Sequence, residues 1–259
     1  MKDIKKTSGL LEALVRTDRR PVGIKFVYSA DEYDSYEGTA LVKPVSYCMA
    51  VKGATRGHSI KMPSAMGGCP GGNRALGLSD DMDVFLSGEN GYRMGLYESP
   101  EVAASVANSL PYLKERPYGI IIKPFAEFEH EPDVVLVVCC PREAMRILQG
   151  YSYTYGLQQH FTMCGNQAVC FESTIIPLST GEINLSMFCS GTRYKASWDE
   201  NEVICGIPCC RIEGTVSGLL GTVDAVEEDP RKTEIDAALK SLGINDFKIR
   251  YGETYYAKR

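Results

Sequence analysis

One apolar run followed by a proline limits the folds open to this chain more than any other feature. Val134 to Cys140 is continuously apolar and rich in β-branched valine, and Pro141 follows it directly. Proline suits the first position of a helix, and the next residues continue a helical pattern through Leu148. A strand that is apolar at every position is buried on both faces of its sheet. The run therefore predicts an α/β or α+β fold with layers on both sides of a central sheet.

Other segments of the chain complete this picture. Alternating or β-branched runs predict strands, and apolar residues at helical spacing predict helices. Between Gly53 and Gly95 the chain is rich in glycine and predicts a long loop, which in a compact domain is commonly functional. We expect a central mixed sheet of about five strands flanked by helices. The expected strands are 22–28, 118–125, 134–140, 184–188 and 202–207, and the expected helices are 4–15, 44–53, 99–108, 141–148, 209–220 and 233–242.

The length of the chain bears on its division into domains. At 259 residues it lies near the upper limit for one hydrophobic core. No internal repeat and no low-complexity linker interrupts it. We therefore expect a single domain over residues 1–259. The acidic stretch from Glu227 to Pro230 sets off residues 227–259 as a C-terminal helical appendage.

Charge and hydropathy exclude several classes of partner. The net charge is −5 and the two signs are interspersed, so no basic surface is expected for nucleic acid. The longest apolar stretch, 134–140, is too short to cross a bilayer, and the charged residues 1–6 do not resemble a secretory signal. These features predict a cytoplasmic protein that binds neither nucleic acid nor membrane.

Ten cysteines are present, which is many for a chain expected in a reducing compartment. There, clustered cysteines are more often metal ligands or catalytic thiols than disulfides. No two of them form a Cys-x-x-Cys pair, so the thioredoxin motif and the usual zinc knuckles are excluded. The compact ferredoxin spacing is also missing. Any metal site must be assembled from cysteines that are distant in the sequence.

The most suggestive cysteine stands in Cys69-Pro-Gly-Gly72. Gly71 and Gly72 allow a close approach of the backbone, so several N–H groups can face the sulfur or a group bound to it. The alternative is a glycine-rich turn in which Cys69 has no special role. Residue types alone leave both readings open.

A second candidate lies in the stretch from Asn184 to Arg193, which contains Cys189-Ser-Gly-Thr-Arg193. A strand delivers Cys189 to its end, where α/β sheets commonly bind ligands. The guanidinium of Arg193 suits a carboxylate or a phosphate. The alternative is a surface arginine on a loop, and the sequence does not decide between them.

Several motifs together resemble domain-of-unknown-function family 169, a family of uncharacterised cysteine-rich archaeal and bacterial proteins. The resemblance covers most of the chain and is specific only as a set, since no single motif identifies the family. Its marks are Arg20-Pro-Val-Gly-Ile-Lys-Phe26, Cys48, Cys69-Pro-Gly-Gly72, Pro132-Asp-Val-Val135, Cys170 before Ile176-Pro177, Gly181-Glu-Ile-Asn184, Cys189-Ser-Gly-Thr-Arg193 and 202–208.

The resemblance supplies no activity, but it selects four of the ten cysteines. Those on its motifs are Cys48, Cys69, Cys170 and Cys189. Four thiolates match the requirement of a cubane iron–sulfur cluster or of a structural zinc ion. Zinc ligands are usually paired at short spacing, and these are not, so the resemblance favours a 4Fe-4S cluster.

These observations predict an iron–sulfur redox protein with a pocket for a small anionic molecule. Cys48, Cys69, Cys170 and Cys189 would bind the metal, and Arg193, Arg74, Lys25, Gly71 and Gly72 would bind the ligand. An electron-transfer partner or a homo-oligomer fits this function, and the sequence does not decide whether the protein is an oxidoreductase, a lyase or no enzyme. Two alternatives stay open: a metal-free ligand-binding protein whose cysteines are structural, and a thiol-dependent enzyme that uses Cys69 or Cys189.

Overall fold

A seven-stranded mixed sheet forms the centre of the part of the chain that the structure, a computed structural model, describes: residues 3–79, 83–252 and 254. Its strand order is β2-β3-β4-β1-β5-β7-β6, and all neighbours are antiparallel except β2 and β3. The strands are β1 (Val22–Val27), β2 (Thr39–Ala40), β3 (Ile60–Pro63), β4 (Gly119–Pro124), β5 (Val134–Cys139), β6 (Asn184–Ser186) and β7 (Val203–Pro208).

The predicted fold class is confirmed, and the expected strands all form with small shifts of their ends. The sheet is larger than expected because β2 and β3 add to one edge. These two strands contain only two and four residues, which is too short for a recognisable alternation. The segment 53–95, expected to be a loop, also contains short helices.

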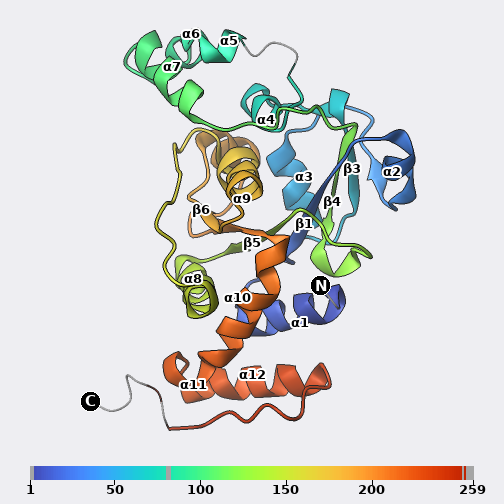
Figure 1. Ribbon diagram of the computed structural model, residues 1–259, viewed down its shortest axis with the longest axis vertical. Helices are drawn as coiled ribbons and strands as arrows, with labels where there is room; N and C mark the ends of the chain where they lie inside the picture. The colour runs from blue at the N-terminus through green and yellow to red at the C-terminus, as the bar shows by residue number, and fades with distance from the viewer. Residues whose placement is uncertain (1–2, 80–82, 253, 255–259) are drawn as a thin grey trace.

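Helices lie on both sides of the sheet (Figure 1). None of those in the described part of the chain is long and apolar enough to span a bilayer. The α-helices are α1 (Ile4–Leu14), α2 (Ala30–Ser35), α3 (Tyr47–Ala54), α4 (Pro70–Ala75), α5 (Asp83–Leu86), α6 (Glu89–Arg93), α7 (Pro100–Ser109), α8 (Pro141–Tyr155), α9 (Ile176–Thr180), α10 (Cys209–Gly221), α11 (Val223–Val226) and α12 (Asp229–Ser241). The chain also forms two short π-helical segments, η3 (Ala168–Ile175) and η4 (Gly191–Lys195). Two 3₁₀ turns are present as well, η1 (Ser64–Met66) and η2 (Phe125–Glu127).

The central strand β5 divides the core in two. Its residues alternate between the faces of the sheet, as the pleat requires. Val135 and Val137 join a core that includes residues of α1, α8, α10 and α12, which we call the helical face. Val134 and Leu136 join a second core with α3 and η3, which we call the cysteine face. Burial of β5 at every position is thus explained by two separate cores.

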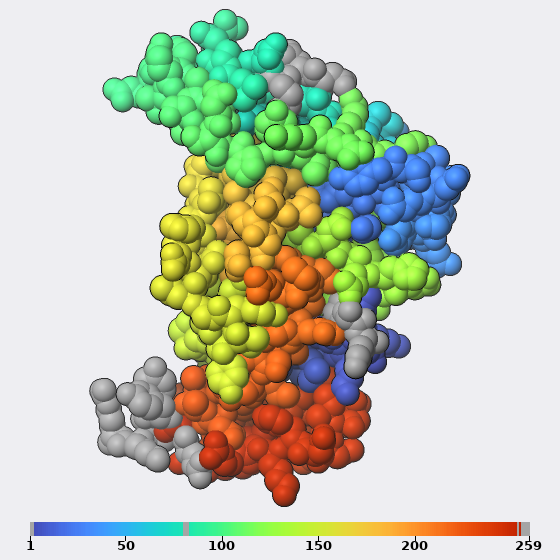
Figure 2. All heavy atoms as spheres, viewed as in Figure 1, coloured from blue at the N-terminus to red at the C-terminus, as the bar shows by residue number. Residues whose placement is uncertain are grey.

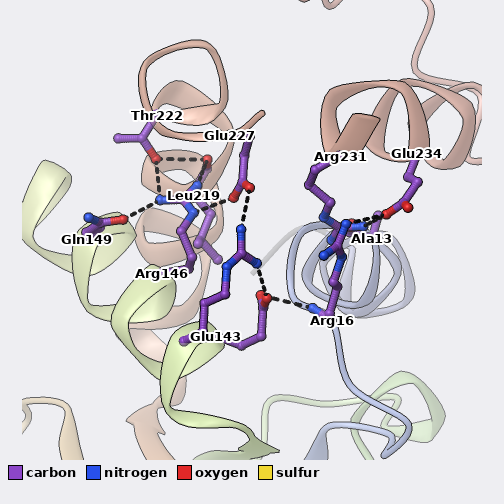
Figure 3. A network of polar contacts seen from close by, with 11 residues as sticks. Ala13, Arg16, Glu143, Arg146, Gln149, Leu219, Thr222, Glu227, Arg231 and Glu234 are labelled. Carbon is purple, nitrogen blue, oxygen red and sulfur yellow. Dashed lines mark hydrogen bonds and ion pairs between the residues drawn. The ribbon is translucent and has the colours of Figure 1, made fainter. Parts of the chain in front are cut away.

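On the helical face, two charged side chains are buried as an ion pair. Arg146 of α8 and Glu227, which follows α11, are each almost fully buried and lie 2.5 Å apart (Figure 3). Glu227 also accepts a hydrogen bond from Arg142. The segment from residue 227 on carries α12, whose Ile235 and Leu239 belong to the core of the helical face. The division into domains stays a prediction, but α12 is joined to the rest by buried contacts.

A separate group of helices stands at the other end of the molecule. The helices α5, α6 and α7 pack on one another and project from the body, as Figures 1 and 2 show for the green segment. We call residues 83–109 the arm. The helix α7 begins as the sequence predicts, with Pro100 in its first turn and the N–H of Val102 donating to the Ser99 hydroxyl.

Candidate functional site

A cavity of about 360 Å³ lies on the cysteine face, beside the arm. Its walls come from α3, α4, η3, η4 and the arm. All four cysteines selected by the resemblance line it: Cys48, Cys69, Cys170 and Cys189. Side chains separated by as many as 141 positions in the sequence (48 to 189) therefore border one space.

A short backbone ladder brings Cys48 and Cys69 to the same side of the cavity. Val45 and Gly67 form a parallel bridge, and the N–H of Gly68 donates to the carbonyl of Val45 at 2.9 Å. A Cβ on Gly68 would lie only 2.8 Å from the carbonyl carbon of Val45. Glycine is therefore required for the two segments to approach this closely.

Cys170 is carried by the π-helical segment η3. Such segments are rare and are found frequently at functional sites. The hydroxyl groups of Tyr47 and Thr174 are 2.9 Å apart and fully buried, which ties η3 to α3. A Cβ on Gly72 would lie 3.9 Å from the sulfur of Cys170, so α4 also approaches η3 closely.

Cys189 follows a strained residue and precedes the second π-helical segment. Phe188 has a φ of 68°, which is unusual for a bulky side chain. Backbone strain of this kind is concentrated at functional sites. The sulfur of Cys189 is 3.1 Å from the hydroxyl of Thr192 in η4. The strand β6 thus ends in a turn that presents Cys189 to the cavity.

The thiols of the cavity influence one another electrostatically. Burial raises the pKa of the Cys170 thiol well above its ordinary value, and nearby Cys69, Cys189 and Cys48 raise it further. Burial also raises the pKa of the Cys48 thiol, although hydrogen bonds with Ser46 and Thr192 oppose the effect. Cys48 and Cys170 are therefore protonated in the metal-free protein at neutral pH.

The side chains do not stand in the arrangement of a single-ion site. Among residues 3–79, 83–252 and 254, no three His, Cys, Asp or Glu side chains are placed to share one metal ion. The four cysteines that line the cavity belong to separate segments: α3, the residue before α4, η3 and the turn before η4.

Three of the five residues predicted to bind a ligand lie at the cavity. Gly71, Gly72 and Arg74 all line it. A Cβ on Gly71 would make only an ordinary contact, 3.6 Å from Cγ of Gln167. Arg74 is almost fully buried, although it carries a charge.

Arg193 and Lys25, the other two residues predicted to bind a ligand, are not among the residues that line the cavity. The guanidinium of Arg193 donates to the carbonyls of Met187, Asp199 and Glu202, so it fixes the turn around Cys189. Lys25 forms an ion pair of 2.9 Å with Asp133. Neither residue lines the cavity, and their role in binding a ligand stays a prediction.

Sequence reasoning missed Glu172, which organises two loops of the site. Its carboxylate is almost fully buried and accepts hydrogen bonds from the N–H groups of Cys164 and Gly165. It also accepts from the hydroxyl of Ser186, which in turn accepts from the N–H of Phe188. Glu172 therefore joins the loop before η3 to the turn that presents Cys189. A glutamate inside an apolar stretch was the signal that could have identified it.

The arm was also missed as a wall of the site. Phe85, Leu96, Tyr97 and Val106 all line the cavity, although the sequence predicts only a glycine-rich loop up to Gly95. The remaining cysteines are free thiols outside the cavity. Cys139 is buried and packs in the core, as the sequence predicts.

Comparison with known proteins places the chain in a family. A family model, domain-of-unknown-function family 169, described as uncharacterised ArCR, matches residues 10–218. The chain belongs to this family. The match covers the four cysteines of the cavity and ends before α11 and α12. The resemblance seen in the sequence motifs is therefore confirmed.

One curated relative adds to this result. The uncharacterized protein MJ0308 of Methanocaldococcus jannaschii is 22% identical over 221 residues, which cover 84% of this chain and 94% of the relative. No solved structure matches the chain significantly. The family and this relative carry no assigned activity, so the function must be argued from the site itself.

Proposed function

We propose that this protein binds a 4Fe-4S cluster through Cys48, Cys69, Cys170 and Cys189 and uses it in a redox reaction. The observation that carries the proposal is that these four cysteines, and none of the other six, line one cavity. Four thiolates are the usual ligand set of such a cluster. When bound, the cluster would supply electron transfer or an electrophilic iron.

The spacing of the four cysteines favours a cluster over a single zinc ion. Zinc ligands are usually paired at short spacing in the sequence. No two of the four cavity cysteines are closer than 19 positions, the separation of Cys170 and Cys189. A cluster also occupies volume between its ligands, and these four line a cavity of about 360 Å³.

The pKa shifts of two cavity thiols, Cys48 and Cys170, argue against these two residues as nucleophiles. A catalytic cysteine needs a lowered pKa, because the thiolate is the reactive form. The pKa values of Cys48 and Cys170 are instead raised, first by burial and then by the neighbouring thiols. Bound metal displaces these protons and removes the mutual repulsion of the thiolates.

The test is the metal content of the native protein, purified without oxygen. We expect four iron and four sulfide per chain, a broad visible absorption and its bleaching by dithionite. Protein free of iron, before and after incubation with ferrous iron and sulfide, would contradict the proposal. If the native protein contains stoichiometric zinc, the site holds a structural zinc ion and not a cluster.

The thiol-enzyme alternative is separated by the same preparation. Iodoacetamide should label Cys69 in metal-free protein, since Cys69 is exposed, and should label it slowly in iron-loaded protein. In colourless protein at neutral pH, Cys69 or Cys189 could instead react with iodoacetamide much faster than free cysteine does. That result would identify the residue as a catalytic nucleophile and support the thiol-enzyme alternative.

A further inference from the structure

Part of the cavity lies away from the cysteines and is lined by other residues. Its wall on the side of the arm is apolar, formed by Phe85, Met94, Leu96 and Val106. Its volume, about 360 Å³, falls within the range of small-molecule sites, about 300–1,000 Å³. The space therefore has an apolar part that lies between the cysteine-bearing segments and the arm.

Arg74 is a buried charge that borders this space. It has a relative exposure of 1%, and no carboxylate among the described residues forms an ion pair with it. One of its terminal nitrogens donates to the carbonyl of Ala107, and its guanidinium lies 5.9 Å from the ring centre of Phe85. Its Nε has no hydrogen-bond partner. A buried cation without a counter-ion is costly, unless a ligand supplies the charge.

A second unpartnered atom belongs to another wall of the same cavity. Oε1 of Gln167, in the loop before η3, is buried and accepts no hydrogen bond. Buried polar atoms in folded proteins nearly always have partners. Arg74 Nε requires an acceptor and Gln167 Oε1 requires a donor, so one molecule that offers both would satisfy the site.

We propose that the cavity binds a small organic acid with an apolar body, and that Arg74 anchors its single anionic group. The apolar body lies against the arm, and a hydroxyl, amino or amide N–H of the ligand donates to Gln167 Oε1. A carboxylate or sulfonate is the anionic group, because one guanidinium among apolar walls does not match the charge of a polyphosphate. This inference uses the cavity of the proposed function and names the class of ligand that shares it with the cluster.

The test compares two fluorescent probes that differ in charge. 1-Anilinonaphthalene-8-sulfonate has an apolar body, one sulfonate and one N–H, and N-phenyl-1-naphthylamine lacks the sulfonate. We expect saturable binding of the sulfonate probe at one site of the full-length chain. The variant Arg74→Met should weaken its binding about 10-fold to 100-fold, as expected for loss of a charge-assisted hydrogen bond. Binding of the neutral probe should change less than about 3-fold, and Arg74→Lys should restore part of the loss.

A matched control is available on the arm itself. Arg93 is an exposed arginine of α6 that pairs with Glu89 and does not line the cavity. Arg93→Met should therefore leave the binding of both probes unchanged. Phenylacetate should displace the sulfonate probe from the native protein and not the neutral probe from Arg74→Met.

Three results would overturn the inference. If Arg74→Met binds the sulfonate probe as tightly as the native protein does, Arg74 does not anchor the anionic group. Equal loss of both probes means that Arg74 only holds the arm to the body. Absence of saturable binding in native protein means that the cavity accepts no such ligand.

The outcome is independent of the proposed cluster, because the probes are titrated into protein both before and after iron loading. If the protein binds the anionic probe selectively but never takes up iron, this inference stands and the proposed cluster is rejected. A stoichiometric cluster with no anion-selective binding would do the reverse.

Discussion

The most deeply buried arginines on the two faces of the sheet have opposite surroundings. On the helical face, Arg146 and Glu227 are both about 2% exposed and pair with each other, with further hydrogen bonds from Arg146 to Gln149 and Thr222. On the cysteine face, Arg74 is equally buried but has no carboxylate partner among the described residues, and its Nε is unpaired. Of the five unpartnered buried side-chain atoms in the described residues, four belong to Arg74, Gln167, Ser173 and Trp198 on the cysteine face.

The backbone shows the same contrast. The helical face is built from long regular helices, such as α8 and α10, which approach so closely that a Cβ on Gly218 would meet the carbonyl of Gly150 at 1.9 Å. The cysteine face contains both π-helical segments and the strained Phe188. Irregular backbone and unsatisfied polar atoms cost stability, and they persist where a function requires them. One face therefore stabilises the fold, and the other contains the strained and unpartnered groups on which the two proposals rest.

The largest effect on stability is expected on the helical face. Glu227→Gln leaves Arg146 buried without a counter-charge, which typically costs about 3–5 kcal/mol. We expect that loss in the free energy of unfolding measured with urea, with the iron content of folded protein unchanged. Glu234→Gln is the control, because Glu234 is exposed and solvent screens its ion pairs with Arg16 and Arg231, so they contribute little to stability. A loss below 1 kcal/mol in Glu227→Gln would remove the contrast between the faces.

A smaller effect is expected for the buried carboxylate of the cysteine face. Glu172→Gln keeps the shape of the side chain but replaces one carboxylate oxygen with an NH₂ group. That NH₂ then faces a group that now donates a hydrogen bond to Glu172, at Cys164, Gly165 or Ser186. We expect a loss of about 1.5–3 kcal/mol in the free energy of unfolding. The variant should also shift the cluster's electron paramagnetic resonance spectrum, because the turn before Cys189 moves. Glu200→Gln, an exposed change, should alter neither quantity. An unaltered spectrum in destabilised Glu172→Gln would limit Glu172 to a structural role.

The smallest change in stability, with a clear effect on metal, is expected at Gly68. Gly68→Ala places a methyl group 2.8 Å from the carbonyl carbon of Val45, and such overpacking costs about 1–3 kcal/mol. The segments that carry Cys48 and Cys69 should separate, and the iron content should fall. Gly71→Ala is the matched control, because its methyl group makes only a 3.6 Å contact with Gln167. Iron loss that is equal in both variants would show that the ladder between Val45 and Gly67 does not position the ligands.

The sequence predicted much of the fold because its signals are local. The apolar residues from Val134 to Cys139 indicate a buried strand, and Ser99 before Pro100 indicates the start of a helix. The strands β2 and β3 were missed because two to four residues carry no pattern. The π-helical form of η3 and η4 was missed because it depends on hydrogen-bond register rather than on residue type.

The site was predictable only in part, for a related reason. The motifs selected the four cysteines that line the cavity, and chemistry selected Arg74. The contacts of Arg193 could not be predicted, because a sequence shows that an arginine is near a turn but not that carbonyl groups of that turn will bind it. The wall provided by the arm depends on contacts between distant segments, which no local pattern reports.

Single Cys→Ser substitutions, each followed by anaerobic iron loading and metal analysis, test the central claim most directly. Replacing Cys48, Cys69, Cys170 or Cys189 with serine should lower the iron content from about four per chain to less than half, with loss of visible absorption. Cys140→Ser and Cys210→Ser, at exposed cysteines outside the cavity, should keep the full content. Full iron content in all four cavity variants, or equal losses in the two controls, would contradict the assignment of these four thiols to one metal centre.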